Sequence, residues 1–203
     1  MGSVNENSAM KFLFVTSFTE TSTIDLEGAG TVRKGPTGKI YRWVKNASDD
    51  AARVGAPACF DAGNLASAAF LQECTTEDMV AADDVYFAGV WLAAVAGGSY
   101  GWIQQWGVYS SGRILYCTGK TTPAVGDLCF PNMSTDTADT TLAGAPYAFH
   151  NLIAQGVTEG SVNTALFTER YVNPHAVLLE VGSTSAAAST VPDTLTMFIK
   201  GLL

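Results

Sequence analysis

The sequence predicts an all-β fold: a single β-barrel or β-sandwich domain, jelly-roll-like, with at most one short helix and an extended N-terminal arm. Three observations lead to this prediction. The 203 residues include 20 glycines and 7 prolines at short intervals, as expected for many short strands joined by turns. Several segments alternate in hydropathy with a period of two, and no repeated helical pattern separates them. Hydrophobic residues make up 47% of the chain, which excludes a disordered protein.

The chain is expected to divide into a flexible, polar N-terminal arm, residues 1–11, and one β-rich domain, residues 12–203. The first half of this domain contains three predicted strands. Residues 11–18 are predicted to form a short strand. In residues 39–45, Ile40, Arg42 and Val44 alternate with Tyr41, Trp43 and Lys45, so this strand should present two different faces. Residues 53–60 are predicted to form another strand, bent at Pro57.

Residues 64–73 are the one helix candidate in the sequence. Asn64 is a suitable N-cap. Four of the following residues would share one helical face, namely Leu65, Ala68, Ala69 and Gln72.

The second half continues with strands. Residues 85–95 are an unbroken apolar run, which indicates a strand buried on both faces. After the turn at Gly97-Gly98-Ser99, residues 100–109 alternate again in hydropathy. Residues 85–95 and 100–109 are therefore predicted to form a β-hairpin. Strict alternation would place five residues on one side of this strand: Tyr100, Trp102, Gln104, Trp106 and Val108. The remaining strands are predicted at 114–118, 128–130, 148–157, 176–181 and 195–200.

Charge and hydropathy narrow the choice of partners. Lys and Arg total 11 and Asp and Glu total 19, which gives a net charge of −8. This sign disfavours nucleic acid as a partner. The apolar run up to residue 96 is shorter than the roughly 20 residues that a membrane helix needs, so no membrane association is expected. The low charged fraction of 15% predicts that other subunits cover much of the surface.

The metal-ligating residue types form no recognisable site. The cysteines at 59, 74, 117 and 129 have no close C-x-x-C spacing, and the two histidines are His150 and His175. We therefore expect reduced, mostly buried thiols. The acidic pairs at 49–50, 77–78 and 83–84 lack the spacing of a calcium loop, so we interpret them as solvated charge. No metal and no cofactor are expected.

Residues 97–101 match the G-x-S-x-G pattern of a hydrolase nucleophile elbow centred on Ser99. Asp127 and then His150 or His175 follow in the order of such enzymes. The elbow requires a helix directly after the serine, whereas residues 102–107 alternate like a strand. The hairpin turn is therefore the favoured interpretation, and a serine hydrolase using Ser99 is a remote alternative.

The four tryptophans, at 43, 91, 102 and 106, have two interpretations. An exposed aromatic strip could bind sugars, so a carbohydrate-binding β-sandwich is an alternative function. The favoured interpretation is packing, with some of these rings in the core and others at contacts between chains. The predicted subunit or capsid contact consists of Trp102, Trp106, Tyr100 and Trp43.

Several short phrases of the chain resemble one class of protein. These phrases are Gly38-Lys39-Ile40-Tyr41-Arg42-Trp43-Val44-Lys45-Asn46, Ala88-Gly89-Val90, Gly98-Ser99-Tyr100-Gly101-Trp102-Ile103-Gln104 with Gly107-Val108, Ala124-Val125-Gly126-Asp127-Leu128, and Phe198-Ile199-Lys200-Gly201-Leu202. Together they resemble structural proteins of tailed-bacteriophage heads, especially the decoration or cement proteins of the outer capsid.

This resemblance implies a β-rich homotrimer that binds the major capsid protein on the virion surface, after synthesis in the bacterial cytoplasm. It implies no catalysis, no small-molecule substrate and no fixed functional residues to assign by position. A head-fibre or tail-fibre component is the alternative within virions.

Overall fold

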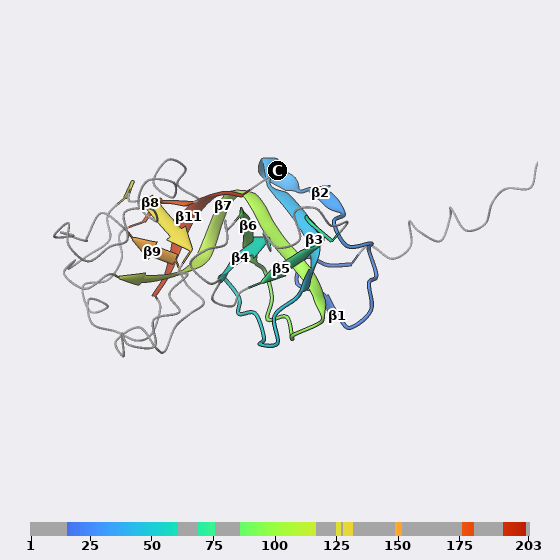
Figure 1. Ribbon diagram of the computed structural model, residues 1–203. Coiled ribbons are helices and arrows are strands. Elements are labelled where there is room, and N and C mark those ends of the chain that lie inside the picture. The colour runs from blue at the N-terminus through green and yellow to red at the C-terminus, as the bar shows by residue number, and fades with distance from the viewer. Residues whose placement is uncertain are drawn as a thin grey trace, which may run out of the picture.

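The computed structural model describes residues 16–60, 69–75, 86–116, 125–126, 128–131, 149–151, 176–180 and 193–201. In these ranges the chain is all-β and contains a closed five-strand barrel with further strands, which confirms the predicted fold class (Figure 1). The described residues include no α-helix; their one helical element is the short 3-10 turn η1 (Pro36–Gly38). No helix among them is long and apolar enough to cross a membrane.

The strands belong to one hydrogen-bonded network. In chain order they are β1 (Thr21–Ser22), β2 (Val32–Lys34), β3 (Ile40–Asn46), β4 (Pro57–Phe60), β5 (Glu73–Thr75), β6 (Tyr86–Trp91), β7 (Tyr100–Tyr116), β8 (Leu128–Pro131), β9 (Phe149–Asn151), β10 (Ala176–Leu178) and β11 (Asp193–Lys200).

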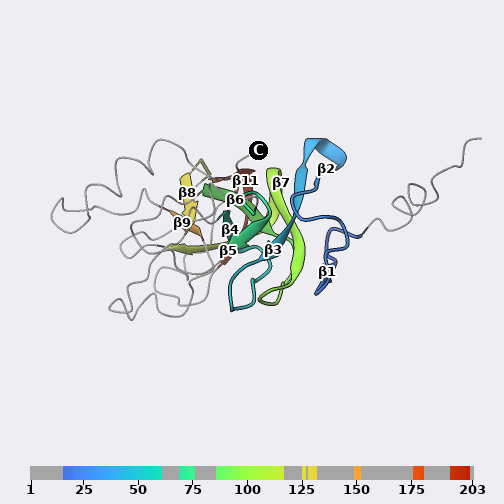
Figure 2. The same ribbon diagram turned by 45° about the vertical axis from the view of Figure 1, so that its right-hand side comes forward.

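The long strand β7 organises this network because it takes part in two closed circuits of strand pairs. The first circuit runs β3–β5–β4–β6–β7 and returns to β3. The second runs β7–β9–β8–β10–β11 and returns to β7. Figures 1 and 2 show β7 passing from the strands of the first circuit to those of the second. We refer to the first circuit as the barrel.

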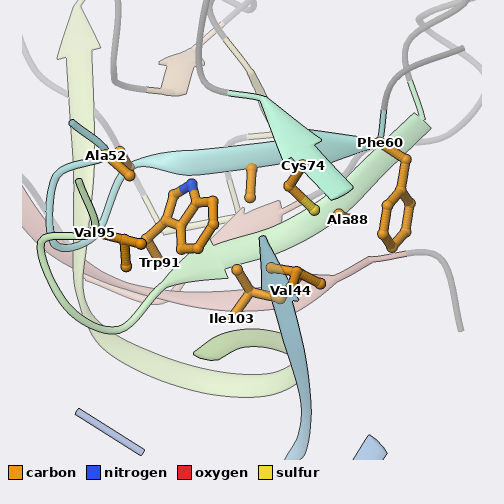
Figure 3. Close-up of a cluster of buried hydrophobic side chains, with 10 residues drawn as sticks. Val44, Ala52, Phe60, Cys74, Ala88, Trp91, Val95 and Ile103 are labelled. Carbon is orange, nitrogen blue, oxygen red and sulfur yellow. The ribbon is translucent and has the colours of Figure 1, made fainter. Parts of the chain in front are cut away.

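The barrel encloses a core to which each of its five strands contributes (Figure 3). Val44 of β3 and Ile103 of β7 point inward and meet Trp91 of β6, and all three are fully buried. The other buried members are Ala52, Ala56, Ala58, Phe60, Cys74, Ala88 and Val95.

A second core lies on the opposite side of β4 and β6. Cys59, Phe87 and Val90 point away from the barrel interior and pack with Leu178 and Met197 of β10 and β11. Strand β6 is therefore buried on both faces, as its unbroken apolar run predicted. The strand ends at Trp91, however, and the chain bends before Val95 bridges to Ala52.

Two predictions in the first half need correction. Residues 69–73 are not helical: the chain turns at Leu71, which has a φ of 70°, and Glu73 already begins β5. The pairing of β5 with β3 and β4 outweighs the weak helical pattern there. Residues 16–18 are also outside any strand. The rest of both segments lies outside the described residues, as does the predicted arm at 1–11, and the domain division stays a prediction.

Candidate interaction surface

Trp43 and Trp102 lie directly opposite each other on β3 and β7. Their rings meet edge to face, with centroids 5.4 Å apart, and both side chains are fully buried. Both were predicted to contact another subunit or the capsid. The structure places both rings beneath other residues of the same chain, and their contact with a neighbouring protein stays a prediction.

The cover is the N-terminal strap, which we define as residues 16–34. Phe18 of the strap stacks on Tyr41 with ring centroids 3.9 Å apart, and it meets Trp102 edge to face at 5.4 Å. The guanidinium carbon of Arg33 lies 4.7 Å from the centroid of the Trp102 ring, a cation–π distance. The strap thus turns an outward sheet face into a third buried cluster.

Polar contacts fix the strap to both tryptophans. The Trp102 Nε1–H donates to Thr16 Oγ1 at 2.9 Å, and the Trp43 Nε1–H donates to Asp25 Oδ1 at 2.9 Å. Glu27 accepts from the Thr16 amide at 2.9 Å and from its hydroxyl at 2.6 Å, and it pairs with Arg33. The buried indole N–H groups of Trp43 and Trp102 therefore have the partners that burial requires.

The carboxyl group of Glu27 titrates below its usual range. Its partial burial acts to raise the pKa, but the two hydrogen bonds from Thr16 and the positive charge of Arg33 outweigh this and lower the pKa. A lowered pKa in the folded state means that stability is fully present above the unfolded-state pKa. It is then lost as the pH falls through the folded-state pKa.

Glu27→Gln should therefore flatten the acid side of the stability profile. We expect the substitution to lower the free energy of unfolding at pH 7 by about 1–2 kcal/mol, since it removes charge-assisted hydrogen bonds. The loss should shrink as the pH falls from about 4.3, the ordinary glutamate pKa, because the unfolded wild-type chain then binds a proton that folded Glu27 accepts only at a lower pH. Urea unfolding followed by tryptophan fluorescence between pH 3 and 7 measures this. The exposed Glu20→Gln is the control, and parallel profiles for wild type and Glu27→Gln would contradict the prediction.

Trp106 lies on the opposite face of β7 from Trp102, which corrects the strict alternation expected for this strand. Tyr41 pairs with Gln104, but the next residue back, Ile40, pairs with Trp106, so β7 contains one extra residue, a β-bulge. An extra residue reverses the face of every side chain after it. The Gln104 side-chain amide donates to the Gly107 carbonyl oxygen at 3.0 Å and bridges the irregular stretch.

Trp106 belongs to an apolar surface that we call the Trp106 patch: Trp106, Val108 and Phe198. The Trp106 and Phe198 rings meet edge to face at 5.2 Å, and both side chains are half-buried. Phe198 pairs with Val108, whose side chain is 43% exposed. Sequence analysis missed Phe198 as a surface residue. A signal was present in the sequence, since strict alternation places Phe198 on the same strand face as Thr194 and Thr196.

Tyr100 is half-buried at the start of β7 and stacks on Trp43, with ring centroids 6.3 Å apart and planes inclined by 10°. Its accessible part is separated from Trp106 by the length of β7 that carries the bulge. The structure therefore does not bring the four predicted contact residues together. Tyr100 and Trp106 stay predicted contact residues, on different parts of the surface.

Ser99 lies in a tight turn, as the hairpin interpretation predicted. Its amide donates to the Ala96 carbonyl oxygen at 3.0 Å, its carbonyl oxygen accepts from the Asn46 amide at 2.8 Å, and a strand follows it. The helix that a nucleophile elbow requires is replaced by β7.

Cys59, Cys74 and Cys129 are buried free thiols, as expected, and burial raises the pKa of Cys74 well above its usual value. Cys117 lies outside the described residues. In the described ranges, no three His, Cys, Asp or Glu side chains are placed to hold a metal ion.

No match emerges from known protein families, curated proteins or solved structures. The described surface offers one candidate contact, the Trp106 patch. It combines a half-buried indole, a half-buried phenyl ring and an exposed aliphatic side chain on paired strands.

Proposed function

We propose that this chain is a non-catalytic structural protein of a tailed-bacteriophage head, which binds the outer capsid surface as a decoration or cement protein and stabilises the shell. The observation that carries the proposal is the Trp106 patch, an apolar surface held by the pairing of β7 with β11. Aromatic residues are enriched at protein interfaces and supply much of the binding energy there. The proposed partners are the major capsid protein and further copies of this chain in a homotrimer.

Composition supports the same proposal. A charged fraction of 15% suits a protein whose surface is shared with neighbours, and the net charge of −8 opposes binding to packaged DNA. Repetition of a moderate contact around a shell would stabilise the whole particle without any single tight site. The glycine-rich and aromatic segments resemble those of phage head proteins. This resemblance is the reason for proposing a bacteriophage capsid as the binding partner.

Heads that lack this protein should assemble but release their DNA at a lower temperature than complete heads. Purified protein added back should restore heat resistance, because binding to the intact shell alone stabilises that state by mass action. Trp106→Lys should raise the protein concentration needed for half-rescue at least about tenfold, since buried aromatic contacts dominate interfaces. Val54→Lys is the matched control, because Val54 is 45% exposed and lies outside the patch. DNA release on heating, followed by dye fluorescence, is the measurement.

Equal heat resistance of heads with and without saturating protein would contradict the cement role. Light scattering tests the self-association separately: a trimer has about three times the chain mass of 21.3 kDa. If the heads do not respond and a glycan binds wild type but not Trp106→Lys, the carbohydrate-binding alternative takes its place.

A further inference from the structure

Arg42 is a buried cation that faces the barrel interior. It lies between Tyr41 and Trp43 of β3 and pairs with Ile103, so its side chain shares the inner face with Val44. Its exposed fraction is 8%. The guanidinium carbon lies 5.9 Å from the centroid of the Phe60 ring in the barrel core. A charge in such a place is costly unless an opposite charge compensates it.

The contacts of Arg42 leave that charge uncompensated among the described residues. The Nε–H donates to Gln105 Oε1 at 3.0 Å, and an Nη1–H donates to the Gly30 carbonyl oxygen at 3.2 Å. Both acceptors are neutral. Two other basic residues show the contrast, because Arg33 pairs with Glu27 and Lys45 pairs with Glu73.

Three donors of the guanidinium group are unused. Arginine has five N–H donors, and the contacts to Gln105 and Gly30 use two of them. The remaining donors are one N–H on Nη1 and two on Nη2. Among the described side chains, Trp91 Nε1 is the one nitrogen or oxygen atom that is fully enclosed without a partner, so Arg42 Nη2, for which the described residues provide no acceptor, is not fully enclosed.

The bulge in β7 helps to orient these donors. Gln105 is the extra residue between Gln104 and Trp106, and its side-chain oxygen holds the Nε side of the guanidinium group. The carbonyl oxygen of Gly30 in the strap accepts one Nη1–H. With these two contacts in place, one N–H of Nη1 and one of Nη2 can together receive the two oxygens of a carboxylate.

We propose that Arg42 is a carboxylate-binding site between the bulge of β7 and Gly30 of the strap. The ligand is a carboxylate held end-on by Nη1 and Nη2, from either a free small acid or an Asp or Glu side chain of a second copy of this chain. This site lies apart from the Trp106 patch, and it does not depend on the proposed function.

The test is a titration with sodium formate at pH 7, with sodium chloride keeping the ionic strength constant. The melting temperature of the wild type should rise saturably, on the order of 5 °C when formate exceeds its Kd about a hundredfold. Arg42→Met should show no such rise. Gln105→Glu should show none either, because it places a carboxylate beside Arg42 while leaving the arginine in place. Lys34→Met, which removes an exposed cation, should respond like the wild type.

Light scattering separates the two sources of the carboxylate. If a second copy supplies it, formate should lower the mass of the wild type to that of Arg42→Met without formate; if a free acid does, the mass should not change. A wild type that changes neither in melting temperature nor in mass overturns the proposal, and so does an equal response of all four proteins. If Arg42→Met does not fold, wild type and Gln105→Glu still decide the question.

Discussion

Gly89→Ala should prevent stable folding, or cost at least about 4 kcal/mol of the free energy of unfolding. Gly89 of β6 has a φ of 155°, and a Cβ atom there would overlap the Gln104 carbonyl oxygen and lie 2.9 Å from its carbon. Both atoms belong to the backbone of β7, so no side-chain rotation can relieve the overlap. The strands would have to separate at the place where β7 closes the barrel.

Urea unfolding, or the yield of soluble protein if the variant does not fold, measures the effect. Gly98→Ala is the matched control. Gly98 has a φ of 72°, but no atom lies within 4 Å of an added Cβ. Its cost should be only about 1–2 kcal/mol, the strain of a left-handed conformation for alanine. Equal costs at both positions would mean that the close approach of β6 and β7 is not tight.

Trp102→Ala should destabilise the protein by about 3–5 kcal/mol, the usual range for removing a large buried aromatic side chain. The substitution removes the ring on which Phe18 and Arg33 of the strap rest, and it leaves Thr16 Oγ1 without its indole donor. Trp106→Ala, in contrast, should cost less than about 2 kcal/mol, because Trp106 is only half-buried.

Thermal and urea unfolding of the two alanine variants measures this difference. Limited proteolysis adds a second readout, since cleavage within the strap should become faster in Trp102→Ala than in Trp106→Ala. If Trp106→Ala proves the more destabilising, then the assignment of Trp102 to the core and Trp106 to the surface is wrong.

Local patterns predicted strand identity well where neighbouring residues determine it. The alternation in β3 separated Val44, which enters the barrel, from Trp43, which leaves it, and the structure confirms both faces. The apolar run of β6 likewise predicted burial on two faces. In both cases the period of the side chains carries the information.

Contacts between distant segments were not predictable in the same way. The burial of Trp43 and Trp102 depends on the strap, whose Asp25 and Thr16 are far from β7 in the sequence. The face of Trp106 depends on a bulge that no change in hydropathy marks. The turn at Leu71 depends on strand partners that complete the barrel. Each of these features follows from tertiary pairing and not from local preference.

The position of β7 in both circuits also constrains how the chain folds. Its partners range from Thr21, which pairs with Gly101, to Lys200, which pairs with Trp106. Such pairings have high contact order, and proteins dominated by them fold in milliseconds to seconds. During synthesis, the barrel can close once β7 has left the ribosome, whereas the second circuit must wait for β11. Until then, the part of β7 from Trp106 onward has an unpaired edge, which makes the newly made chain most vulnerable to aggregation at this stage.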